Sequence, residues 1–214
     1  MNAFMLIIAA IVGFAIVLYS ISAMSRLSGK DGFYTLLFLL IAGVNGMIAT
    51  GDIFNFFVFL EISSLAGAAL VAYRIDRGVA AEAGLKYIAL STLGGLMFLV
   101  GIGILLAQYN SLNMAVLASR IQMTQLDMIA FALFFAALAM KCGAVPMHFW
   151  TPDSYSMAPS AVTAFLVVSS QASLYGLFRI SYTLYGEVLN TTTIGWVIII
   201  LGILSMFVGV TMAI

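Results

Sequence analysis

Long apolar runs separated by short polar turns make up almost the whole chain. Crossing the ~30 Å hydrocarbon core of a bilayer takes about 20 helical residues. Seven runs approach or exceed that length: residues 3–24, 33–50, 53–73, 84–107, 127–149, 159–185 and 193–214. None alternates in the manner of an outer-membrane barrel strand, whereas a helix satisfies its own backbone in lipid. The pattern therefore predicts an all-α membrane protein with about seven transmembrane helices, forming a single transmembrane domain over residues 1–214.

The connections between these runs are short, with one exception. In the turn before the third run, Asp52 is placed to accept hydrogen bonds from the free amides at the start of the next helix. The one long connection, residues 108–126, carries Met114 and Leu117 at helical spacing. We expect a short amphipathic helix there, lying at the membrane interface.

Composition excludes most other classes of protein. Apolar residues make up 64% of the chain and charged residues 7%, with a mean hydropathy of +1.18. The formal net charge is zero, so no basic surface for nucleic acid is expected. With one histidine and one cysteine, no metal site of the usual kinds can be assembled. Neither a GxSxG elbow nor a phosphate-binding loop is present, so we expect no cofactor and no catalysis by this chain alone.

Basic residues in the loops predict the orientation of the chain. The first and third loops carry four of them: Arg26, Lys30, Arg74 and Arg77. The second, fourth and sixth loops carry only Arg120, although Arg179 near the end of the sixth run weakens the bias. By the positive-inside rule the N-terminus lies outside and the C-terminus in the cytoplasm, in a cell (cytoplasmic or inner) membrane.

Two opposite charges fall near mid-membrane. A charge at the centre of a lipid-facing helix costs about 2.5–3.5 kcal/mol, so Lys141 should face the protein interior and have a partner. Glu61 lies nine residues beyond Asp52, about 13 Å along its helix at ~1.5 Å per residue. Burial favours the neutral form of each group, whereas pairing favours the charged forms. The pair is therefore either a proton switch or a static ion pair that fixes helix packing.

Three further residues surround this pair in the sequence. Lys86, about half a turn into the run 84–107, is either a snorkelling lysine or part of the same path. Pro146 should break its helix and free the carbonyl of Cys142, at a depth where a break must be protein-buried or line water. His148 is either a proton carrier on the face of Lys141 or an interfacial histidine.

A polar stripe follows on the sixth run. Gln171, Tyr175 and Arg179 are spaced i, i+4, i+8 and share one helix face. We take Gln171 and Tyr175 as a candidate polar relay. The alternative is that such residues only hold neighbouring helices together.

Two strings carry a family resemblance: TGDIFNFFVFLEISSLAGAALVAY and KCGAVPMHFWTPDSYSMAPSAVTAFL. They resemble the antiporter-like membrane subunits of Mrp-type cation/proton antiporters, respiratory complex I and energy-converting membrane hydrogenases, with the D-type Mrp subunit most similar. Subunits of that family have about fourteen helices, in which two inverted five-helix repeats form two proton half-channels. The resemblance covers about helices 3 to 9, hence one five-helix repeat with a broken helix near Pro146.

The resemblance also implies roles for individual residues. Glu61 matches the family's acidic residue on its fifth helix, Lys86 a lysine on the sixth, and Lys141 the lysine of the broken seventh. Position 171 departs from the pattern, because glutamine stands where a lysine or histidine is common. The second repeat has no counterpart in this chain, as would be so for a split subunit or for part of a longer one.

The expected function is that of a membrane subunit in a multi-subunit ion-translocating complex. The chain would contribute a proton or Na⁺-coupled half-channel through a buried Glu–Lys relay, with neighbouring antiporter-like subunits as partners. The alternative is a degenerate subunit that only supports assembly of a membrane arm. An independent transporter is the weakest reading, since the symmetric halves expected for alternating access are missing. The sequence leaves open whether the complex is an antiporter, a hydrogenase, a sulfur reductase or complex I. It also leaves open whether the complex is driven by a redox reaction.

Overall fold

The structure, a computed structural model, describes residues 2–24, 30–73, 78–186 and 188–213. Helices fill this part of the chain and no strand occurs in it, which confirms the all-α membrane fold. Seven of the described helices are long and apolar enough to cross a membrane. These are α1 (Asn2–Ala23), α2 (Lys30–Ala49), α3 (Ile53–Val71), α4 (Gly78–Tyr109), α6 (Gln125–Cys142), α8 (Ser160–Arg179) with its π-helical continuation η1 (Ile180–Leu184), and α9 (Thr191–Ala213). Arg26, Arg74 and Arg77, on which the orientation rests, lie outside the described residues.

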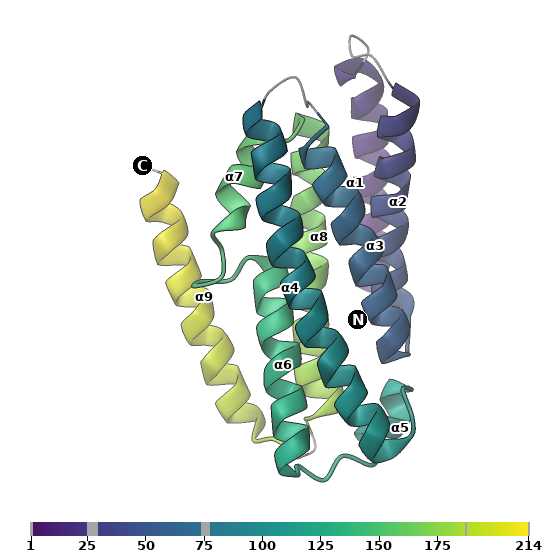
Figure 1. Cartoon of the computed structure of the whole chain (residues 1–214), viewed down its shortest axis with the longest axis vertical. Coiled ribbons are helices and arrows are strands. Elements are labelled where there is room, and N and C mark those ends of the chain that lie inside the picture. The colour runs from purple at the N-terminus through teal and green to yellow at the C-terminus, as the bar shows by residue number, and fades with distance from the viewer. Residues whose placement is uncertain (1, 25–29, 74–77, 187, 214) are drawn as a thin grey trace.

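The helices run up and down side by side, and α9 lies at the edge of the bundle (Figure 1). Helix α2 packs on α3, α3 on α4, α4 on α6, and α6 on α8. Helix α1 packs against both α2 and α8. The core between them is rich in aromatic rings; Phe98, for example, lies 4.7 Å from Phe134 and 5.6 Å from Phe56, measured between ring centroids. Most of α9 is exposed, and it is the least buried of the seven spans within the described structure.

The turn before α3 folds as its sequence predicts. The carboxylate of Asp52 accepts hydrogen bonds from the amides of Phe54 and Asn55, both at 2.9 Å, which confirms the predicted cap. The long connection contains the short helix α5 (Met114–Ala118), with Met114 and Leu117 buried. Two backbone hydrogen bonds, Ile53 N to Leu112 O and Met114 N to Gly51 O, join α5 to this turn at the lower end of the bundle in Figure 1.

Helix α6 begins at a reciprocal capping box. The Thr124 hydroxyl accepts from the Asp127 amide, and the Asp127 carboxylate accepts from the Thr124 amide at 3.0 Å. Asp127 is fully buried, and the hydroxyl of Tyr109 also donates to it at 2.7 Å. The box therefore holds the lower end of α6 against the end of α4.

Replacing Thr124 by alanine should destabilise the protein by about 1 kcal/mol, within the range of about 0.5–2 kcal/mol for losing an N-cap side chain. The measurement is the unfolding free energy in detergent micelles. Thr211→Ala is the matched control, because the Thr211 hydroxyl is exposed on α9 and donates only to the carbonyl of Val208. An equal loss in both variants would contradict a special role for the box.

Two helices have bounds that differ from the apolar runs. Helix α4 begins at Gly78 rather than at residue 84, so Lys86 lies more than two turns inside it. The run 127–149 is broken near Pro146 as expected: α6 ends at Cys142, and a second short helix, α7 (Trp150–Met157), follows. Hydropathy does not mark these bounds, because α4 extends beyond the apolar run at both ends and apolar residues continue past the end of α6.

Candidate ion-translocation site

Lys141 and Glu61 form a direct ion pair inside the bundle. The Lys141 Nζ lies 2.6 Å from Glu61 Oε1, and the side chains are 3% and 23% exposed. The ammonium also donates to the Ser64 hydroxyl at 2.7 Å, and that hydroxyl donates to the Leu60 carbonyl at 2.8 Å. The contact expected between the two mid-membrane charges is therefore present, with Ser64 as a third member.

The local sequence of α3 explains this arrangement. Glu61 and Ser64 are three residues apart, so they share one face of the helix, near its middle. Helix α4 comes close to that face at Gly95, where an added Cβ would stand only 2.3 Å from Glu61 Oε1. A residue with any side chain at position 95 would push Glu61 away from its place beside Lys141.

The break between α6 and α7 lies directly after Lys141. Gly143 adopts a left-handed conformation with φ of 74°, and the amides of Gly143 and Ala144 satisfy carbonyls of the last turn of α6. The Trp150 indole donates to the Met140 carbonyl at 3.0 Å, so α7 is fastened to the end of α6. Lys141 therefore sits in the last turn of a half-helix, where the helix dipole favours a positive charge.

Pro146 lies inside the connection, close to the predicted break. It follows a cis peptide bond after Val145, three residues after Gly143 caps α6. Helix α6 ends at Cys142, the residue whose carbonyl would meet the ring of Pro146 in a continuous helix. The Val145 amide donates to Ser205 of α9 at 3.0 Å, so the connection is also bonded to the outermost helix.

Lys86 is held by two carboxylates on the other side of the break. Its Nζ lies 2.9 Å from Glu82, one turn back on α4, and 2.8 Å from Asp153 on α7. About half of the Lys86 and Asp153 side-chain surface is exposed. Lys86 is therefore not a lone snorkelling lysine, and it joins α7 to α4; the contact with Asp153 is one that sequence reasoning missed.

His148 lies in the connection rather than on a continuation of α6. A continuous helix would place it on the same face as Lys141, but the helix is broken between the two residues, so they share no helix face. Its ring stacks on Phe149 with centroids 5.1 Å apart, and its Nδ1 is buried without a hydrogen-bond partner within the described structure.

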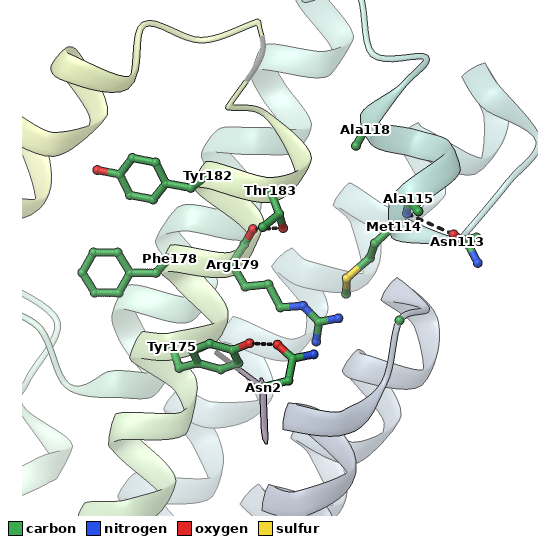
Figure 2. A pocket seen from close by; sticks show the side chains of 11 residues that line it. Asn2, Asn113, Met114, Ala115, Ala118, Tyr175, Phe178, Arg179, Tyr182 and Thr183 are labelled. Atoms are coloured by element: carbon green, nitrogen blue, oxygen red, sulfur yellow. Dashed lines mark hydrogen bonds between the residues drawn. The ribbon is translucent and has the colours of Figure 1, made fainter. Parts of the chain in front are cut away.

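The predicted relay of Gln171 and Tyr175 is divided between two cavities. Gln171 lines a cavity of about 330 Å³ between the end of α6, α8 and α9. Tyr175 lines another, of about 870 Å³, at the lower end of α8, where its hydroxyl donates to Asn2 (Figure 2). The two residues share a face of α8 but line different cavities, because different neighbouring helices cover successive turns of α8.

Comparison with known proteins places this geometry in a family. The family described as NADH:quinone oxidoreductase/Mrp antiporter, TM matches residues 50–214. The chain is 41% identical over 157 residues to NADH-quinone oxidoreductase subunit N of Desulforudis audaxviator, covering 72% of this chain and 31% of that protein. It is 34% identical over 211 residues to the D-type Na(+)/H(+) antiporter subunit of Alkalihalophilus pseudofirmus, covering 96% of this chain and 42% of that protein.

Solved structures are similar as well. A chain of the membrane-bound sulfane sulfur reductase, an archaeal respiratory membrane complex, superimposes with a TM-score of 0.76 at 39% identity, over 82% of this chain and 36% of that one. A chain of the Mrp complex from Dietzia sp. gives 0.75 at 29% identity, over 86% and 35% of the two chains. The chain thus spans well under half the length of these relatives, and it belongs to the NADH:quinone oxidoreductase/Mrp antiporter family of membrane proteins.

Proposed function

We propose that this chain is a membrane subunit of a multi-subunit ion-translocating complex and supplies a proton half-channel through Glu61 and Lys141. The observation that carries the proposal is the buried ion pair at the break between α6 and α7. Family membership supports it, because relatives include a Na(+)/H(+) antiporter subunit and a chain of the Mrp complex. The partners would be neighbouring antiporter-like subunits, and the membrane the cytoplasmic one, with the N-terminus outside.

The chemistry of the pair suits a switch. While Glu61 and Lys141 are in contact, each stabilises the charge of the other. If a neighbouring charge draws Glu61 away, the buried ammonium loses its main partner and favours releasing a proton. Lys86 and His148, on the α7 side of the break, would load or release protons, and coupling to Na⁺ in a partner subunit is compatible with this role.

The test is a Lys141→Met variant in the assembled complex, reconstituted into liposomes. We expect ion pumping to fall to the level of empty liposomes, because methionine fills a similar volume but carries no proton. Arg120→Met is the control: Arg120 is an exposed basic residue in the α5–α6 connection whose side chain donates to the Tyr109 carbonyl. A Lys141→Met complex that assembles and pumps at the wild-type rate would contradict the proposal.

One observation favours the alternative of a structural subunit without conduction. Gln171 on α8, the next candidate for a relay after Lys141, carries no titratable proton. It also lines a different cavity from Tyr175. In that case the Glu61–Lys141 pair would serve packing alone. The alternative predicts that transport survives whenever assembly survives.

A further inference from the structure

A large cavity lies away from the ion pair, at the lower end of the bundle. Its volume is about 870 Å³, a usual size for a ligand site. It lies between the start of α1, the turn before α3, helix α5 and the junction of α8 with η1 (Figure 2). The polar and aromatic side chains that matter in its lining are Asn2, Asn113, Tyr175, Phe178, Arg179 and Tyr182.

Several elements around this cavity contribute an end or a turn. Gly51 lies in the turn before α3, Asn113 precedes the short helix α5, and Arg179 is followed by η1, which ends its span at Leu184. The ends of membrane-spanning helices lie at the level of the lipid headgroups, where tyrosines are also enriched. The cavity is therefore placed where a headgroup can enter it from the side.

The polar groups of the cavity are mainly hydrogen-bond donors. Arg179 donates to the Ile48 carbonyl at 3.3 Å and forms no ion pair within the described structure. The Asn2 oxygen accepts from Tyr175, and the Asn113 oxygen accepts from the amides of Ala115 and Val116, so both side-chain amides keep their N–H groups for another partner. No aspartate or glutamate is among the lining residues, so the cavity favours an anion.

The remaining wall is aromatic and apolar. Figure 2 shows the Arg179 guanidinium reaching toward α5, while Phe178 and Tyr182 project on the other side of α8 and η1. These two rings stack 6.1 Å apart, and Tyr182 is 38% exposed. A π-helical turn begins directly after Arg179, and such turns are frequent at functional sites. The Arg179 guanidinium and two neutral amides beside a partly exposed apolar wall suit an amphiphile with an anionic end.

We propose that this cavity binds the phosphate headgroup of an anionic phospholipid. Arg179 forms charge-assisted hydrogen bonds to the phosphate, the amides of Asn2 and Asn113 donate to its other oxygens, and the first part of an acyl chain lies along Phe178 and Tyr182. Free inorganic phosphate would engage only the donors. This site does not depend on the proposed ion path, since none of its lining residues contacts Glu61 or Lys141 through a hydrogen bond or ion pair in the described structure.

The test is native mass spectrometry of the purified complex, titrated with phosphatidylglycerol and separately with phosphatidylcholine. We expect one tightly bound phosphatidylglycerol per chain and clearly weaker binding of phosphatidylcholine. Arg179→Gln should weaken phosphatidylglycerol binding about tenfold or more, as expected for loss of hydrogen bonds to a charged group. Arg120→Gln is the matched control and should bind as the wild type does, because Arg120 is an exposed arginine outside the cavity.

Two further variants keep the result interpretable. If Arg179→Gln fails to assemble, Arg179→Lys tests the site in its place. It retains the positive charge and should keep most of the phosphatidylglycerol binding. Phe178→Ala should weaken the lipid but not inorganic phosphate. Equal binding of the two lipids, or binding unchanged in Arg179→Gln, would overturn the proposal. Displacement of the bound lipid by inorganic phosphate would also overturn the proposal. So would an Arg179→Gln complex that loses a protein subunit but keeps its bound lipid.

Discussion

Replacing Glu61 by glutamine alone should destabilise the protein by about 3–5 kcal/mol, the usual cost of removing one partner of a buried ion pair. The variant removes the negative charge beside Lys141, whose side chain is 3% exposed and whose other described polar partner is the Ser64 hydroxyl. Lys141→Met should cost a similar amount, because it leaves the Glu61 carboxylate near mid-membrane without its ammonium partner. Unfolding in mixed micelles, compared with wild type, measures both values.

The double variant Glu61→Gln/Lys141→Met separates the two roles of the pair. Replacing both partners of a buried pair is often neutral, so stability and assembly should return close to wild type. If the pair is a proton switch, transport stays lost in the assembled double variant. If the pair only supports packing, transport returns together with assembly. A double variant as unstable as Glu61→Gln would contradict the ion pair as the source of the single-variant loss.

Replacing Gly43 by leucine should separate α2 from α3 and prevent assembly of the bundle. A Cβ at position 43 would stand 2.8 Å from the backbone nitrogen of Ser63 and 3.0 Å from the carbonyl oxygen of Phe59. Because both atoms belong to helix backbone, no rotamer change can relieve the overlap. The loss of folding free energy should therefore be larger than the cost of ordinary overpacking, which is about 1–3 kcal/mol.

The matched control for this variant is Gly103→Leu. Gly103 lies on α4 with nothing within 4 Å of its added Cβ, so leucine there should leave stability and assembly unchanged. Yield of the folded protein from membranes and its melting temperature are the two measurements. Similar behaviour of both variants would show that helix propensity, rather than the contact between α2 and α3, decides the outcome.

Much of the fold and the central contact could be predicted from the sequence. Seven apolar runs predict seven helices because lipid leaves no other way to satisfy the backbone of a span. Glu61 and Lys141 could be paired because they are the two opposite charges near mid-membrane, where each needs a partner. The contact of Ser64 with this pair could also have been predicted, since Ser64 lies one turn from Glu61 on the same helix face.

Other contacts could not be predicted, because they depend on how helices rotate and where they end. Asp153 meets Lys86 only because α7 packs beside α4 after the break. The break itself falls at Gly143 through a left-handed backbone conformation that hydropathy cannot detect. Gln171 and Tyr175 were grouped by their spacing, yet the helices that cover each of them differ.

The hydrogen bond between the Val145 amide and Ser205 has a consequence for natural sequence variation. Most positions of α9 are exposed within the described structure, and few of its side chains make polar contacts there. Position 205 differs, because an apolar residue there would leave the Val145 amide without an acceptor at membrane depth. At this position, selection would act on a single hydroxyl group.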